Sequence, residues 1–444
     1  MASAAEQLAA NLNFSAFSKA KDLQRRIWFT LSMLIIYRIG TYIPLPGIDP
    51  DIFAQTFENI SAGIGGVINV FAGGAIERMA IFALNIMPYI SASIIMQLMT
   101  TISPRLEQLK KEGEQGRKQI NQYTRYLTVG LAAVQAFAIA NGLLAREGMV
   151  TLDPAFFLVS ATVTLTCGTV FLMWLGEQIT ARGVGNGISL IIFAGIIAEM
   201  PSALFNLLQL GRQGTLSAPM ILGVLVMIIG VLGFIVFMER AQRRLLVQYP
   251  KRQKGNRMFG GETSHLPLKL NTAGVIPPIF ASSLLLLPLT AAGFQGQGAP
   301  GWLTQITTFF GPGTLPYMIV YAAMIIFFCF FYTAIVFNPN DTADNLKKYG
   351  GFIPGIRPGK RTAEYLDYVL TRITTVGALY LAAVCLLPEV LRAQNANIPF
   401  YFGGTSLLIV VSVTMDTIAQ VQSHLFAHQY EGLISKSRLR GTRK

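Results

Sequence analysis

Residues 219–238 read PMILGVLVMIIGVLGFIVFM and contain no charged side chain. A helix of about 20 such residues is long enough to cross the ~30 Å hydrocarbon core of a bilayer. Similar runs occur along the rest of the chain, at 27–43, 79–100, 126–142, 155–175, 187–207, 273–293, 315–337, 370–388 and 403–423. The sequence therefore predicts an all-α polytopic membrane protein with ten transmembrane helices.

Basic residues are distributed unevenly between the loops. Most of the 35 Lys and Arg lie in loops 101–125, 176–186, 239–272 and 338–369 and in the two tails. The opposite loops hold four, which are Arg78, Arg146, Arg212 and Arg392. Because basic loops remain in the cytoplasm, we expect ten crossings with both termini inside.

The composition agrees with a membrane protein. Hydrophobic residues make up 52% of the 444 residues and charged residues 13%, with a mean hydropathy of +0.50. The net charge of +13 is concentrated on one side of the predicted membrane. We therefore expect this positive face to bind anionic phospholipids and a cytoplasmic partner. Nucleic acid as such is not expected, with the surface of a ribosome as the exception.

The predicted spans divide the chain into two halves of five. Residues 1–24 form an amphipathic cytoplasmic segment, suited to a membrane surface anchor. The amino-terminal half covers 25–217, the carboxyl-terminal half covers 218–423, and a basic cytoplasmic tail covers 424–444. Because five is odd, the two halves have opposite orientations in the membrane, as in an inverted repeat.

A short internal repeat supports this arrangement. The window Ile86-Met-Pro-Tyr-Ile-Ser-Ala-Ser93 resembles Val275-Ile-Pro-Pro-Ile-Phe-Ala-Ser282. We call these the paired windows. Their prolines, Pro88, Pro277 and Pro278, are expected to interrupt spans two and seven. Hydroxyl and amide side chains nearby predict a weakly held seam between the two spans: Ser91, Ser93, Gln97, Asn271, Ser282 and Ser283.

Residues 61–76 are apolar but too short to span the membrane. The segment contains Gly63, Gly65, Gly66, Gly73 and Gly74, and each Gly weakens a helix by up to ~1 kcal/mol relative to Ala. Two interpretations remain open, an external re-entrant loop and a movable stopper folded into a cavity.

The longest inside loops, 239–272 and 338–369, are both basic. Such loops are either simply solvated or form a docking surface for a partner. The stretch Gly351-Phe-Ile-Pro-Gly-Ile-Arg-Pro-Gly359 contains too many Gly and Pro residues for a helix and predicts a rigid projecting tip.

No catalytic or metal-binding set is evident. His424 and His428 are spaced four apart, but no Glu follows His424 and no third ligand is evident. The chain therefore predicts no cofactor, no metal and no enzymatic activity of its own. Ionisable residues inside the spans are few. Arg38 lies toward the outer end of span one, where its side chain can reach the membrane surface. Asp416 in span ten is a functional candidate by its depth, but we expect it to be paired structurally.

Several long strings make the chain resemble the SecY family of protein-conducting channels. They include Ile43-Pro-Leu-Pro-Gly-Ile48, Trp174-Leu-Gly-Glu-Gln-Ile-Thr180, Thr263-Ser-His-Leu-Pro-Leu-Lys269, Gly355-Ile-Arg-Pro-Gly359 and Phe400-Tyr-Phe-Gly-Gly-Thr-Ser406. They occur in the family's order over essentially the whole chain.

This resemblance implies two inverted five-helix halves around a central hourglass pore. The narrow waist would be a ring of isoleucines: Ile86, Ile90, Ile188, Ile192, Ile279 and Ile409. A plug would match residues 61–76 and include Gly65, Gly66, Asn69, Phe71, Gly73 and Gly74. A lateral gate would match the seam between spans two and seven and include Pro88, Ser91, Gln97, Asn271, Pro277 and Ser283.

The resemblance also implies partners and a location. Arg243, Arg244 and Arg357 match positions used by the motor ATPase SecA and by ribosomes. The family works with SecE, usually with SecG, and with YidC, in the bacterial cytoplasmic (inner) membrane. It transports unfolded preproteins that carry signal sequences.

Two other function classes compete with a channel. A secondary transporter would also suit inverted repeats and broken helices, but it needs a polar site at the midplane where this chain offers isoleucines. A membrane-embedded enzyme would need an acid pair or a metal set.

Overall fold

A computed structural model describes residues 20–49, 52–53, 69–70, 72–144, 148–213, 218–250, 252–254, 257–259, 263–295, 311, 314–394 and 404–441. Within these residues, seven helices are long and apolar enough to cross a membrane. Two further apolar helices, at Met87–Ile102 and Ile276–Leu285, are shorter, and a 20-residue helix covers Lys21–Gly40. Each of the ten predicted spans thus overlaps with a helix.

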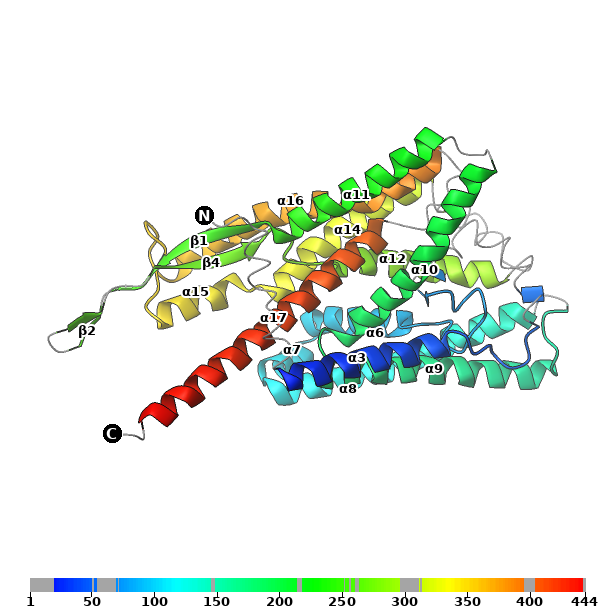
Figure 1. The fold of residues 1–444 in the computed structure, drawn as a ribbon, viewed down its shortest axis with the longest axis horizontal. Helices are drawn as coiled ribbons and strands as arrows, with labels where there is room; N and C mark the ends of the chain where they lie inside the picture. Colours follow the sequence, from blue (N-terminus) through cyan, green and yellow to red (C-terminus); the bar gives the residue numbers. More distant parts are fainter. Residues whose placement is uncertain are drawn as a thin grey trace. The chain divides into compact units, whose positions relative to one another are not determined.

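The elements follow one another in a simple order (Figure 1). The helices are α3 (Lys21–Gly40), α6 (Met87–Ile102), α7 (Pro104–Lys111), α8 (Glu114–Leu144), α9 (Pro154–Arg182), α10 (Gly187–Arg212), α11 (Ala218–Arg240), α12 (Ile276–Gln295), α14 (Leu315–Val336), α15 (Pro339–Lys348), α16 (Lys360–Gln394) and α17 (Gly404–Gly441). The strands are β1 (Gln242–Gln248), β2 (Arg252–Lys254), β3 (Arg257–Phe259) and β4 (Thr263–Lys269).

The chain divides into two compact units. Unit 1 comprises Met1–Ser202, Leu289–Thr304 and Ile409–Lys444, and unit 2 comprises Ala203–Pro288 and Gln305–Leu408. These boundaries differ from the predicted halves, since most of α17 belongs to unit 1. The division at 217 stays a prediction.

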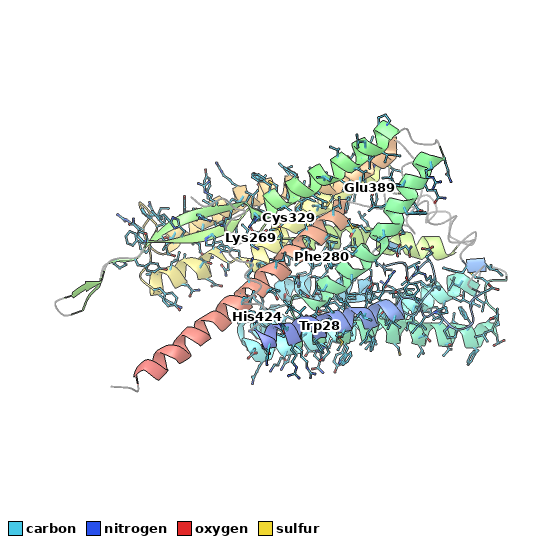
Figure 2. The ribbon with its side chains drawn as sticks, in the orientation of Figure 1. Trp28, Lys269, Phe280, Cys329, Glu389 and His424 are labelled. Atoms are coloured by element: carbon cyan, nitrogen blue, oxygen red, sulfur yellow. The ribbon has the colours of Figure 1, made fainter. Side chains whose placement is uncertain are left out.

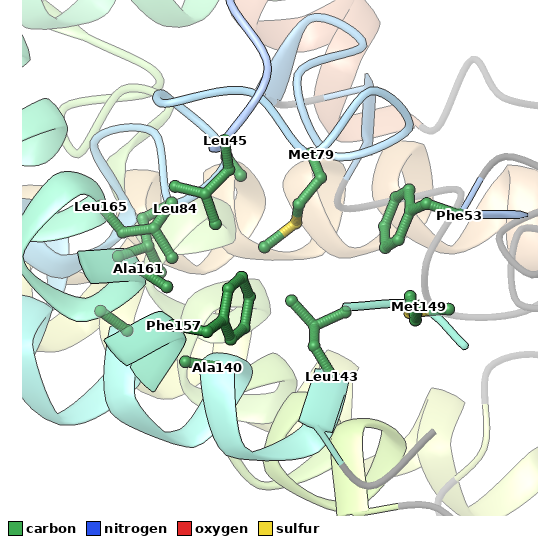
Figure 3. Packing of buried hydrophobic residues seen from close by; sticks show 12 residues of the cluster. Leu45, Phe53, Met79, Leu84, Ala140, Leu143, Met149, Phe157, Ala161 and Leu165 are labelled. Carbon is green, nitrogen blue, oxygen red and sulfur yellow. The ribbon is translucent and has the colours of Figure 1, made fainter. Parts of the chain in front are cut away.

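In unit 1, α8 packs against both α6 and α9. Ala136 and Ala140 of α8 face Phe157 and Ala161 of α9, all fully buried (Figure 3). Such small residues let two helix backbones approach closely in a membrane, where dispersion contacts rather than the hydrophobic effect hold helices together.

In unit 2, α14 and α15 both pack against α16. The aromatic rings of Phe280 in α12 and Phe328 in α14 meet edge to face, with centroids 5.9 Å apart. Figure 2 labels Phe280 together with Cys329, which neighbours Phe328 in α14. Edge-to-face pairing adds about 0.5–1.5 kcal/mol to the area that the rings bury.

The basic loop 239–272 contains strands, which the prediction of an all-helical chain lacked. Strands β1 and β4 pair antiparallel from Gln242↔Lys269 to Gln248↔Thr263 (Figure 1), and the hairpin packs on α16 through Leu366. Leu245 and Val247 are buried while Leu246 is exposed, which is the alternation of a half-buried strand.

The prolines of the paired windows begin helices instead of interrupting them. Helix α6 starts at Met87 and α12 at Ile276, which are equivalent positions in the two windows. Pro88 and Pro277 therefore lie in the first helical turn, where a missing N–H leaves no hydrogen bond unmade. Residues 79–86, predicted as part of span two, form turns.

Candidate functional site: the elements of a channel

The predicted isoleucine ring draws mostly on unit 1. Ile86 and Ile90 are one turn apart at the start of α6, and Ile188 and Ile192 are one turn apart at the start of α10. Residues four apart share a helix face, so each helix presents a pair of isoleucines. Exposed fractions are 1% for Ile86, 8% for Ile90, 6% for Ile192 and 1% for Ile409. Ile279 is half-buried in unit 2, and the closed ring stays a prediction.

The start of α10 is fixed by side chains from three other helices. Thr30 of α3, Thr180 of α9 and Gln420 of α17 each accept a hydrogen bond from a backbone N–H of residues 184–187, at 2.9–3.0 Å. Ile188 and Ile192 follow this turn directly. The turn therefore sets where their side chains stand.

Two glycines bring α9 and α10 together at the same place. A Cβ atom at Gly187 would lie 2.0 Å from the carbonyl oxygen of Gly176. The two helix backbones therefore touch directly. The sequence does not predict these contacts, because nothing in it joins Thr30 or Gln420 to residues 183–187.

The predicted lateral-gate residues separate into the two units. Pro88, Ser91 and Gln97 belong to α6 in unit 1, and Pro277 and Ser283 belong to α12 in unit 2. Ser91 is 7% exposed and Ser283 4% exposed. The pairing of the two helices stays a prediction.

Asn271 makes its contacts inside unit 2. Its amide Nδ2 donates to Glu239 Oε1 at 2.6 Å and to the carbonyl of Gly274 at 3.1 Å. Glu239 belongs to the last turn of α11, so Asn271 joins the end of α11 to the start of α12. Sequence reasoning did not single out Glu239.

Part of the predicted plug lies outside the described residues, namely Gly65, Gly66 and Phe71. The remaining predicted plug residues, Asn69, Gly73 and Gly74, are buried in unit 1.

The three predicted contact arginines all belong to unit 2 and are exposed. Arg243 and Arg244 are on β1, opposite Leu268 and Pro267 of β4. Arg357 lies in the loop before α16, where its carbonyl accepts a hydrogen bond from Thr362 Oγ1 at 2.9 Å.

The two longest basic loops join into one folded structure. Gln248 and Phe352 exchange two backbone hydrogen bonds of 2.9 Å. Leu245 and Leu268 of the hairpin pack in a cluster with Ile353 and with Leu366 of α16. Lys269 ends β4 near this cluster (Figure 2). Loops 239–272 and 338–369 therefore present their charges on a common scaffold.

The two intramembrane ionisable candidates differ. Asp416 is exposed on α17, and it takes part in none of the ion pairs of the described chain. Arg38, at the end of α3, is half-buried and donates to the carbonyl of Gly73.

Comparison with known proteins assigns the chain to a family. The family profile SecY matches residues 80–418. The chain belongs to the SecY family. Protein translocase subunit SecY of Vibrio cholerae is 53% identical over 432 residues, covering 96% of this chain and 97% of the relative. Its counterpart from Escherichia coli K12 is 54% identical over 424 residues, covering 95% and 96%.

Solved structures show the SecY fold directly. A structure described as a protein-conducting channel matches with a TM-score of 0.67 at 19% identity, covering 90% of this chain and 92% of that chain. Sec61 in a canine ribosome–channel complex from the endoplasmic reticulum matches with a TM-score of 0.64 at 19% identity and the same coverage.

Proposed function

We propose that the chain forms the protein-conducting channel of a bacterial translocase. It passes unfolded preproteins across the cytoplasmic (inner) membrane and releases transmembrane segments sideways into lipid. The observation that carries this function is full-length identity above 50% to protein translocase subunits. The buried isoleucines of α6, α10 and α17 agree with it.

The isoleucine ring supplies the seal and the path. A narrow apolar constriction tends to dewet, which stops ions and water while the channel is idle. Aliphatic side chains change rotamer easily, so the ring widens around a passing chain of any sequence. The rigid turn before α10 keeps Ile188 and Ile192 in register as the ring opens.

The starts of α6 and α12 suit a lateral gate. Both helices begin at a proline-containing first turn after a residue of left-handed backbone. A signal sequence is itself an apolar helix. Inserted between α6 and α12, it would take the place of the contacts that these two helices make with each other. Hydrogen bonds between membrane helices are worth only about 0.6–2 kcal/mol each, so such a seam can open and close.

The basic scaffold of loops 239–272 and 338–369 binds the driving partner, the motor SecA or a ribosome. Side chains alternate along a strand. Arg244 therefore shares the outer face of β1 with the exposed Leu246, and Arg243 shares the face of the buried Leu245. SecE, SecG and YidC complete the assembly, and both termini face the cytoplasm beside anionic phospholipids.

Photo-cross-linking tests the channel directly. A photoreactive residue at Ile192 should form adducts with a preprotein arrested halfway, because Ile192 lines the path. The matched control is Leu222 of α11, which is 65% exposed on the most apolar helix and should react with lipid. Adducts at Leu222 and none at Ile192 would contradict the proposed path.

A further inference from the structure

The segment that leads into α6 is fastened to the end of α3. The buried Tyr37 hydroxyl donates to the carbonyl of Ala72 at 3.4 Å, and the Arg38 guanidinium donates to the carbonyl of Gly73. Arg38 also donates to the Tyr42 hydroxyl at 3.1 Å. Two successive side chains of α3 therefore hold two successive carbonyls of a segment 35 residues away.

The same segment presses against α10. Gly73 and Gly74 adopt positive φ angles of 64° and 78°, which L side chains rarely adopt. A Cβ atom at Gly73 would lie 2.9 Å from Gly195 Cα, and one at Gly74 would lie 2.5 Å from Glu199 Oε1. This turn is tightly packed and specified by glycine, whereas the sequence pattern indicated only that its glycines weaken a helix.

The far end of the segment is equally fixed. Residues 79–81 pair with residues 43–45 through backbone hydrogen bonds of 2.9 and 3.0 Å on either side of the Pro44↔Ala80 bridge. Met79 is 1% exposed, and its side chain reaches into the cluster around Leu45 and Phe157 (Figure 3).

Charged side chains surround the turn. Arg38 and Arg78 both stack on the ring of Tyr42, at 5.0 and 4.2 Å from its centroid. Glu199 lies near enough to both arginines for electrostatic attraction. Cation–π contacts of this kind are attractive when partly desolvated, so they add to the hydrogen bonds of Arg38.

We propose that residues 72–80 are a fixed anchor and that Arg38 is its positioning residue. The inference rests on the proposed channel function together with the movable plug that the resemblance to the SecY family implies within residues 61–76. The anchor ends that movement at Ala72, so the plug returns to one place after each transport event. Gly73 and Gly74 belong to the anchor and not to the moving part.

Idle ion leakage through reconstituted channels tests the role of Arg38. Arg38→Gln removes the charge and the terminal nitrogens that bond to Gly73 and Tyr42, and it should raise the idle conductance severalfold. Arg26→Gln is the matched control on the same helix, since Arg26 pairs only with Asp22 at 3.2 Å, among its described contacts. It should leave the conductance unchanged.

A disulfide across the Pro44↔Ala80 bridge tests whether the anchor is stationary. The pair is flanked by the hydrogen bonds and makes none between its own two residues, so its Cα atoms should be about 4.5 Å apart, within disulfide range. The oxidised Pro44→Cys/Ala80→Cys channel should transport preproteins at the wild-type rate. In the Arg38→Gln background, oxidation should return the leak toward wild type, a rescue that general misfolding would not give.

Three results would overturn the anchor: no leak in Arg38→Gln, no rescue by oxidation, or a transport block in the oxidised channel that reduction reverses. Each of these results leaves the proposed function intact, because the wild-type chain would still transport preproteins. Absence of transport by the wild-type chain would instead remove the proposed function.

Discussion

At the scale of single residues, the paired windows share a backbone feature. Asn85 and Gly274, at equivalent positions just before the windows, have φ angles of 49° and 65°. A Cβ atom at Gly274 would meet nothing within 4 Å, so only backbone strain opposes a side chain there. We expect Gly274→Ala to lower the free energy of unfolding by about 1–2 kcal/mol, measured by thermal unfolding in detergent.

Gly223 of α11 is the control for that substitution. It also has open space around its Cβ position, but it lies inside a helix, so Gly223→Ala should be neutral or stabilising by up to ~1 kcal/mol. Equal effects at the two sites would argue against strain. The sequence predicted the paired windows, but the left-handed residue before each became visible only in the backbone, because Asn and Gly are common in many turn types.

At the scale of elements, the β1–β4 hairpin brings α11 and α12 to a common point. Leu270 N donates to the carbonyl of Ala241 at 2.9 Å, and Asn271 then reaches Glu239 at 2.6 Å. Hydrogen bonds to charged groups contribute about 1.5–3 kcal/mol. A double-mutant cycle of Glu239→Ala and Asn271→Ala should therefore give a coupling free energy of about 1 kcal/mol or more.

Thr272→Ala supplies the comparison. The Thr272 hydroxyl donates to the backbone carbonyl of Lys269 at 3.2 Å and not to Glu239. The change in unfolding free energy caused by Thr272→Ala should therefore simply add to the change caused by Glu239→Ala. A cycle with no coupling between Glu239 and Asn271 would show that the bond does not hold α12. Polar residues near the ends of spans two and seven predicted a seam that includes Asn271, and the resemblance to the SecY family implied that this seam is a lateral gate. The sequence did not predict the β1–β4 hairpin. Its many positive charges hide the alternation of buried and exposed residues around Leu245 and Val247.

At the scale of the whole molecule, the length of the apolar runs predicted helices, because crossing the membrane imposes a length on each helix. Seven helices of the described residues are long and apolar enough to cross, and the count of ten crossings stays a prediction. Composition could not predict which loops fold together. The backbone pairing of Gln248 with Phe352 joins residues about a hundred positions apart, and such pairing depends on tertiary packing of Leu245 with Ile353.

That joint scaffold predicts how a charge reversal at Arg357 acts. The side chain is exposed and only its backbone carbonyl has a described partner, so Arg357→Glu should leave folding and co-purification with SecE unchanged. Preprotein import into vesicles driven by SecA should fall at least tenfold, because the reversed charge repels an acidic partner surface. Lys348→Glu, also exposed on this scaffold, should have a much smaller effect. Parallel loss of assembly and import in Arg357→Glu would mean that the arginine stabilises the loop instead of binding the motor.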